Sequence, residues 1–274
     1  MSEELLEKPL LDHVTDLLEM VRRILIYIFS FLILLLFLPV PWLLPKTYHP
    51  FLFYCMDLTN HYMLNFDGNI FSRSFATMFG VNGSTVVLIS HGWFDSLAAA
   101  TLLDILMAIT VLSPVIAWEV YRFIEPGLYS HEKRIVKRYM FFALALFISG
   151  VIYGYTVVMP IVFAVAVWLA TLGGASLFFS IQNFYQNILI GSLATGVFFM
   201  FPLGILALNK AGIVSYEMLH NNWRYIVFAI FVIFTMITPD PTIISDIVLG
   251  LPFIVLYFFT MWLVKRSEKS KKKT

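Results

Sequence analysis

Long apolar runs alternate with short polar segments along most of the chain. A helix needs about 20 consecutive apolar residues to cross roughly 30 Å of hydrocarbon. Six runs approach or reach this length, at approximately residues 24–44, 98–122, 139–166, 184–209, 223–239 and 247–264. We expect six membrane-spanning helices. The last two runs lie nearer the lower limit of about 17 residues, so these spans thin the bilayer locally or stop part-way across it.

Polar segments divide the chain into the parts of one integral membrane domain over residues 1–274. The N-terminal part predicts an amphipathic helix broken by Pro9, without the short apolar core and cleavage site of a secretory signal. A long polar stretch further on carries the turn signal Asn82-Gly83. The expected parts are an amphipathic segment, a six-span core, a loop within that core and a basic tail, at residues 1–23, 24–264, 45–97 and 265–274.

Lys and Arg residues indicate the side of the membrane on which each segment lies, because cytoplasmic loops carry an excess of them. With the N-terminus inside, all 18 Lys and Arg residues except Lys46 and Arg73 lie on the cytoplasmic side. We therefore expect a multi-pass protein of the cytoplasmic membrane. Both termini are then in the cytoplasm, and the loop 45–97 is outside.

The composition excludes an ordinary soluble domain and predicts an all-α membrane protein. Hydrophobic residues make up 60% of the chain and charged residues only 13%, with a mean hydropathy of +0.85. Soluble domains are about 25% charged. Prolines that bend helices lie within or next to the spans, at Pro114, Pro160, Pro202, Pro239 and Pro252. They fit either ordinary irregular membrane helices or a bundle curved as a whole, with a concave face.

The predicted spans lack the residues that catalysis inside a membrane requires. An intramembrane protease needs paired aspartates, a Ser/His pair or metal ligands, and Asp104 is the one carboxylate well inside a span. The six histidines fall in loops or flanks, and none forms H-E-x-x-H. Cys55 is the single cysteine. We expect no enzyme, no metal site and no cofactor.

A six-span ion or small-solute transporter is the alternative function. Such proteins carry several polar residues at mid-membrane depth. Apart from a few hydroxyls, the polar residues of these spans are Asp104, Gln182, Asn183, Gln186 and Asn187. Interfacial capping explains the Gln/Asn group about as well as a solute pathway does. The chain also has no convincing internal repeat, which argues mildly against a transporter built from inverted halves.

One polar stretch between two apolar runs contains the clearest candidate binding site. It reads FIEPGLYSHEKR, residues 123–134, and breaks a helix with a Pro-Gly pair. Glu132 falls in the first turn of the next span, just after Ser130, the expected N-cap, where a carboxylate complements the helix dipole. Its helical neighbours are Ile135 and Val136, so it has no cation on its own face. Glu132 is therefore either a helix-terminal charge or a site for an external guanidinium.

The same stretch resembles the signature of the TatC family, the multi-spanning subunit of the twin-arginine protein translocase. Upstream lies Ser113-Pro114-Val115-Ile116. Downstream, FISGVIYGYTVVMP at residues 147–160 matches the family pattern F-x-x-G-x-x-[FY]-x-Y-x-x-V-x-P. Further matches are Ala211-Gly212-Ile213 and Thr238-Pro239-Asp240. The resemblance covers about residues 105–260, and it implies a six-span membrane protein without bond chemistry.

The resemblance implies a receptor for folded precursor proteins that carry an Arg-Arg signal peptide. In the family the binding site lies on the cytoplasmic side. It combines the glutamate of this motif with a glutamate before span one. The first glutamate maps onto Glu132, with Phe123, Pro126 and Tyr129 in the same motif.

The second acid has two possible alignments. The family pattern H-L-x-E-L-R-x-R meets HVTDLLEMVRRI in this chain. Alignment on Arg23 places Glu19 on the glutamate, whereas alignment on His13 makes Asp16 the acid. We prefer Glu19, because the start of the span fixes its register. Arg22 is expected to substitute for the family's first arginine, which is missing here, and the resemblance places Arg22 and Arg23 among the signal-peptide-binding residues.

The fourth span departs from the family at a membrane-embedded glutamate. The family reads F-E-x-P, whereas this chain reads FMFP, so Met200 occupies the glutamate position. We expect Gln186 or Asn187, nearer the outer face, to take over the docking of partner helices. The implied partners are signal-bearing precursors, TatA/TatB-type single-span subunits, further copies of this chain and membrane lipid, but no nucleic acid. The implied energy source is the proton-motive force.

Overall fold

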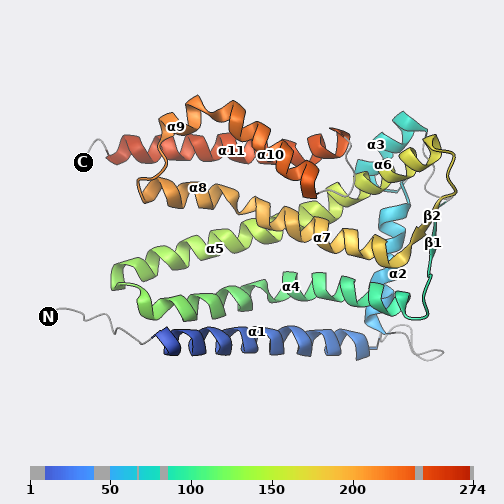
Figure 1. Cartoon of the computed structure of the whole chain (residues 1–274), viewed down its shortest axis with the longest axis horizontal. Helices are drawn as coiled ribbons and strands as arrows, with labels where there is room; N and C mark the ends of the chain where they lie inside the picture. Colours follow the sequence, from blue (N-terminus) through green and yellow to red (C-terminus); the bar gives the residue numbers. More distant parts are fainter. Residues whose placement is uncertain (1–9, 40–49, 67, 81–85, 238–242, 272–274) are drawn as a thin grey trace.

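The computed structural model describes residues 10–39, 50–66, 68–80, 86–237 and 243–271, and it is mostly helical (Figure 1). In chain order its elements are α1 Leu10–Phe37, α2 Phe51–Leu64, α3 Ile70–Phe79, β1 Val87–Ile89, α4 Asp95–Ile124, η3 Glu125–Gly127, α5 Ser130–Tyr153, η4 Gly154–Val158, α6 Met159–Leu172, β2 Phe178–Ser180, α7 Ile181–Phe199, α8 Phe201–Lys210, α9 Tyr216–Asn221, α10 Trp223–Ile237 and α11 Ile243–Lys271. The segment η3 is a 3-10 helix and η4 is a π-helix.

The long helices lie side by side along the longest axis of the molecule (Figure 1). α1 packs against α4, α5 packs against α7, and α11 packs against α8 and α10. The turn between α4 and α5 lies at the same end as the beginning of α1, which we call the hairpin end (Figure 1). The strands β1 and β2 lie at the opposite end, which we call the strand end.

Four of the six predicted spans are confirmed as helical stretches long and apolar enough to cross a membrane. Within the described residues these stretches are Val14–Phe37, Asp95–Gly127, Glu132–Leu172 and Ile181–Lys210. These stretches correspond to the first four predicted spans, at 24–44, 98–122, 139–166 and 184–209, of which residues 40–44 lie outside the described residues.

The last two predicted spans correspond to α10, which is short, and to α11, which is long and continues into charged residues. α10 has 15 residues, fewer than the 17 or so needed to cross the hydrocarbon of a bilayer. α11 has 29 residues and joins the predicted span 247–264 to the start of the basic tail. The total of six spans remains a prediction.

The described part of the predicted outer loop is largely helical, which the residue pattern did not indicate. It contains α2 and α3. The Asn69 side chain caps α3 by accepting a hydrogen bond from the Phe71 backbone N–H at 3.0 Å. Gly80, with a φ of 67°, ends the same helix in a left-handed conformation that a Cβ would disfavour. The turn signal Asn82-Gly83 lies outside the described residues.

The described residues are mostly helical, as predicted, and two short strands add to the helices. β1 and β2 form a parallel pair in which Val87 lies opposite Phe178 and Ile89 lies opposite Ser180. Each strand has only three residues. Because β1 precedes α4 and β2 precedes α7, the pair links the beginnings of these two helices at the strand end.

A proline breaks the third apolar stretch. Pro160 has no N–H, so it cannot donate to the carbonyl of Thr156 four residues earlier. The helix widens into η4 at this point, where Met159 N–H donates to the Gly154 carbonyl. The Tyr62 hydroxyl of α2 donates to the Thr156 carbonyl at 2.9 Å. The hydrogen bond lost at the proline is thus replaced by one from another helix, which fixes α2 against the break.

Glycines allow α5 and η4 to cross α7 at close range. A Cβ on Gly150 would lie 2.8 Å from the Gly196 Cα atom, and a Cβ on Gly154 would lie 2.9 Å from the Ser192 Cα atom. Real side chains do not fit at such distances, so the backbones themselves are in contact. Small residues at helix crossings are typical of membrane proteins, where close packing replaces the hydrophobic effect between helices.

We predict that Gly150→Ala destabilises the protein by about 1–3 kcal/mol, because the added methyl group has no space at the crossing. Gly204→Ala in α8 is the matched control, since a Cβ there would meet no atom within 4 Å. It should leave stability unchanged or raise it by about 0.5–1 kcal/mol. Thermal unfolding in detergent measures both. Equal destabilisation by the two substitutions would contradict the proposed role of the crossing.

Candidate functional site

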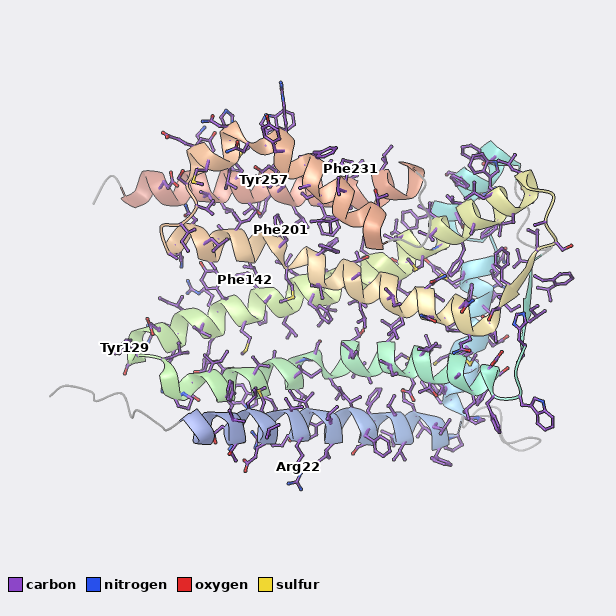
Figure 2. All side chains as sticks on the ribbon, in the orientation of Figure 1. Arg22, Tyr129, Phe142, Phe201, Phe231 and Tyr257 are labelled. Atoms are coloured by element: carbon purple, nitrogen blue, oxygen red, sulfur yellow. The ribbon has the colours of Figure 1, made fainter. Side chains whose placement is uncertain are left out.

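The hairpin end carries the motif that the sequence analysis selected. α4 ends at Ile124, η3 spans Glu125–Gly127 with Pro126 inside it, and α5 begins at Ser130. Tyr129 lies at the tip of the turn (Figure 2) and its side chain is exposed. Phe123 is half-buried and Pro126 is exposed. The Pro-Gly pair therefore makes a tight turn that presents its residues at the end of the bundle.

Glu132 caps helix α5 with one oxygen of its carboxylate. Its Oε2 atom accepts a hydrogen bond from the Tyr129 backbone N–H at 3.1 Å. The residue before the helix is Tyr129, so the expectation that Ser130 is the N-cap is wrong by one residue. Glu132 is half-buried. Glu132 can therefore serve both as a charge at the helix terminus and as a site for an external guanidinium. The hydrogen bond from the Tyr129 N–H holds one carboxylate oxygen and orients the group.

Two of the cations close to Glu132 in sequence, Lys133 and Lys137, have other partners. Lys133 Nζ lies 3.7 Å from Glu125 Oε1. The same Glu125 oxygen accepts a hydrogen bond from the Tyr121 hydroxyl at 3.1 Å, and Lys137 Nζ lies 5.0 Å from the centre of the Tyr121 ring. Among the described residues, none forms an ion pair with Glu132. Its negative charge is thus available to a ligand.

The N-terminal acid lies on α1, at the same end of the bundle. Glu19 has a side chain that is 63% exposed, and its Oε2 atom lies 3.7 Å from Arg23 Nη1. Arg23 Nε also donates to Glu119 Oε2 of α4 at 2.9 Å. Asp16, the alternative acid, is half-buried on the same helix. Arg23 is therefore an internal partner of two carboxylates.

Arg22 does not join the other predicted site residues. Its side chain is exposed and points away from the bundle (Figure 2). The following residue, Arg23, points inward to α4 instead, because neighbouring residues on a helix do not share a face. The expectation that Arg22 replaces the family's missing arginine at the site finds no support in this position.

Glu119 is a charged residue of this site that sequence reasoning missed. Its side chain is only 6% exposed, and it lies near the end of the second predicted span. A carboxylate at the edge of an apolar run needs a cation when it is buried. Arg22 and Arg23 lie at the start of the first predicted span, and Glu119 lies near the end of the second. Both positions are expected on the same side of the membrane, and this could have identified an arginine as the partner of Glu119.

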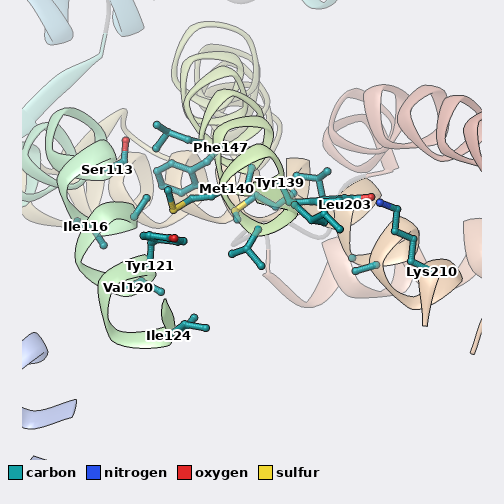
Figure 3. Close-up of a pocket in the computed structure, with 18 of the residues that line it drawn as sticks. Ser113, Ile116, Val120, Tyr121, Ile124, Tyr139, Met140, Phe147, Leu203 and Lys210 are labelled. Atoms are coloured by element: carbon teal, nitrogen blue, oxygen red, sulfur yellow. The ribbon is translucent and has the colours of Figure 1, made fainter. Parts of the chain in front are cut away.

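An apolar groove adjoins the motif. It has a volume of about 890 Å³ and lies between α4, α5 and α8, lined by residues such as Ile116, Val120, Met140 and Leu203 (Figure 3). Met200 also lines it, so the position of the family's glutamate does face a hollow surface. At one side Lys210 Nζ lies 4.6 Å from the centre of the Tyr139 ring. The groove offers no carboxylate to a partner helix.

The expected substitutes for that glutamate lie elsewhere. Gln186 is exposed and Asn187 is half-buried, both near the strand end of α7. Met200 follows Gln186 by 14 residues, which corresponds to roughly 21 Å along a helix. The structure therefore does not bring Gln186 or Asn187 to the groove. Any docking through them would occur at a different depth.

Asp104 is buried in the core of the strand-end half and has no contact with the groove. Its side chain is 2% exposed, and Oδ1 has no hydrogen-bond partner among the described residues. Burial and, second, the nearby Asp104 carboxylate raise the pKa of the Cys55 thiol on α2. In the described part of the chain no three His, Cys, Asp or Glu residues form a cluster that could hold a metal.

A family model described as Sec-independent protein translocase protein (TatC) matches residues 12–252. The chain belongs to the TatC family. The match begins before Asp16 and Glu19, so it includes the N-terminal acids as well as the hairpin motif. TatC proteins are membrane-embedded components of the twin-arginine translocase rather than enzymes. The resemblance inferred from the sequence is confirmed.

Curated relatives extend over much of the chain. The TatC protein of Aquifex aeolicus (strain VF5) is 31% identical over 166 residues, which cover 59% of this chain and 67% of that protein. The TatC protein of Helicobacter pylori (strain J99 / ATCC 700824) is 28% identical over 190 residues, which cover 68% of this chain and 74% of the relative. The similarity is therefore not confined to a short motif.

The fold also matches a solved structure. A crystal structure of the twin-arginine translocase receptor TatC has a TM-score of 0.65 to this chain at 23% sequence identity, covering 93% of this chain and 99% of the other. This likeness supports the arrangement of the helices from α1 to α11.

We predict that Arg23→Ala destabilises the protein by on the order of 3 kcal/mol, because it leaves the Glu119 carboxylate buried without its cation. Arg22→Ala is the matched control, since Arg22 is exposed one residue earlier, and it should change stability by less than about 0.5 kcal/mol. Thermal unfolding in detergent compares the two. Equal effects would show that the Arg23–Glu119 pair does not contribute to stability.

Proposed function

We propose that this TatC protein is the receptor core of a twin-arginine translocase and binds the Arg-Arg signal peptides of folded precursor proteins. Binding takes place at the hairpin end, through Glu132 of the α4–α5 turn and Glu19 of α1, with Phe123, Pro126 and Tyr129 around Glu132. Family membership and the likeness to a solved TatC receptor support this proposal.

The state of the Glu132 carboxylate is the observation that carries the proposal. The group is oriented by the Tyr129 N–H, is partly accessible and has no ion-pair partner among the described residues. The neighbouring Lys133 lies next to Glu125 instead. A guanidinium can donate two parallel hydrogen bonds to such a carboxylate, whereas an ammonium acts as a point charge. This difference accounts for a preference for arginine over lysine.

The proposal includes an orientation in the membrane. With the hairpin end in the cytoplasm, both termini and nearly all Lys and Arg residues lie on the cytoplasmic side, and β1, β2, α2 and α3 lie outside. α10 and α11 would then complete six spans, with α10 as a short one. The cytoplasmic membrane is the location that fits this distribution of charge.

Partner helices remain part of the proposal. TatA/TatB-type single-span subunits would be recruited to build the passage, together with further copies of this chain, and the proton-motive force would supply the energy. Because Met200 provides no carboxylate, a partner would meet an apolar groove surface there. Gln186 and Asn187 offer amide groups only near the strand end. A six-span ion or solute transporter, the alternative, predicts flux in liposomes that contain this chain alone.

We predict that Glu132→Gln weakens binding of an Arg-Arg signal peptide by about 1.5–3 kcal/mol, or roughly tenfold or more. The glutamine oxygen can still accept the Tyr129 N–H, so the cap of α5 is retained while the charge is lost. Binding of a labelled peptide to the purified protein in detergent measures the effect. A Lys-Lys peptide should bind weakly to the unaltered protein and should be little affected by the substitution.

The matched control is Glu217→Gln, which removes an exposed carboxylate of α9 and should leave binding unchanged. Equal binding of Arg-Arg and Lys-Lys peptides to the unaltered protein would contradict the proposed function. So would undiminished export of an Arg-Arg reporter by a strain that carries Glu132→Ala together with Glu19→Ala.

A further inference from the structure

We propose that Glu119 is a positioning residue that keeps Glu19 available to the signal peptide by holding Arg23. The inference rests on the proposed function, and in particular on Glu19 as the N-terminal acid of the site. Glu119 does not touch the ligand. It acts by giving Arg23 a better partner than Glu19.

The geometry around Arg23 is asymmetric. The Arg23 Nε atom lies 2.9 Å from Glu119 Oε2, within the range of a charge-assisted hydrogen bond. The Nη1 atom lies 3.7 Å from Glu19 Oε2, which is beyond hydrogen-bond distance. The contact with Glu119 joins α1 to α4, whereas the contact with Glu19 is made within α1.

The burial of the two carboxylates also favours Glu119 over Glu19 as the partner of Arg23. The Glu119 side chain is 6% exposed and the Glu19 side chain is 63% exposed. Charges attract more strongly where water is excluded, and solvent-exposed ion pairs contribute little. A carboxylate that is buried without a cation is also strongly unfavourable. The guanidinium of Arg23 is therefore held mainly by Glu119, and its contact with the exposed Glu19 is the weaker of the two.

Without Glu119, Arg23 of α1 would pair with Glu19 on the same helix and make it unavailable to a ligand. A glutamate four residues before an arginine is the favoured arrangement for an ion pair on a helix. Arg23 would then turn to Glu19 and compete with the arginine of a signal peptide for the same carboxylate. Since Arg23 belongs to the same helix, its effective concentration at Glu19 is high. Glu119 prevents this competition by holding the side chain toward α4.

A purely structural role for Glu119 makes a different prediction. The pair could serve only to attach α1 to α4, and then any variant that breaks it would weaken binding. Competition predicts instead that removal of Arg23 as well restores binding. The double substitution Glu119→Gln with Arg23→Gln also keeps the net charge of the protein and leaves two amides that can hydrogen-bond each other. It therefore separates the two roles.

The test is the Kd of a labelled Arg-Arg signal peptide for the purified full-length protein in detergent, at low and at physiological salt. Glu119→Gln should raise the Kd about three- to tenfold, and the double variant should return it to near the unaltered value. Glu119→Asp, which retains the charge, should stay close to the unaltered protein. Glu217→Gln, which removes one negative charge at an exposed position of α9, should have no effect.

Three results would overturn the inference while leaving the proposed function intact. These are an unchanged Kd for Glu119→Gln, a double variant that binds as weakly as Glu119→Gln, and a loss of binding in Glu217→Gln as large as that in Glu119→Gln. Thermal unfolding of each variant shows whether it is folded. Failure of the unaltered protein to distinguish Arg-Arg from Lys-Lys would instead refute the proposed function itself.

Discussion

The contact between the backbones of α5 and α7 is the constraint on which the rest of the bundle depends. Gly150, Gly154 and Gly196 remove the side chains that would separate the two helices. In a membrane, where lipid is as apolar as leucine, such close packing is the main attraction between helices. From this crossing α5 and α8, which follows α7, diverge toward the hairpin end (Figure 1). The groove between α4, α5 and α8 lies in that half of the molecule.

The bend beside this crossing shows how the chain tolerates irregular backbone inside an apolar environment. Pro160 frees the Thr156 carbonyl, and the Tyr62 hydroxyl satisfies it. The same region has further hydrogen bonds to α2, from Tyr185 to the Met56 carbonyl at 2.9 Å and between Thr59 and Tyr155 at 2.9 Å. α2, which lies outside the predicted spans, is thus fixed to the core by these hydrogen bonds.

The carboxylates of the hairpin end differ in whether a cation of the same chain lies close to them. Glu119 and Glu125 have cations of the same chain beside them, at 2.9 Å from Arg23 and 3.7 Å from Lys133 respectively. Glu132 has no ion-pair partner among the described residues, and the exposed Glu19 lies 3.7 Å from Arg23, beyond hydrogen-bond distance. Arg23 and Lys133 thus lie against the first two carboxylates. The proposed capture of a signal guanidinium follows from this division of partners.

The sequence by itself determined the first four apolar helices, the motif around Glu132 and the family, because these depend on local composition and on residues close together in the chain. It failed where the partner is distant. The ion pair between Arg23 and Glu119 joins residues 96 apart, and the parallel pairing of β1 with β2 joins segments of only three residues. Periodicity shows which residues are apolar, but it does not show which helix lies beside which. Only the tertiary structure decided that Arg23 of α1 meets Glu119 of α4, because this contact depends on how the two helices pack.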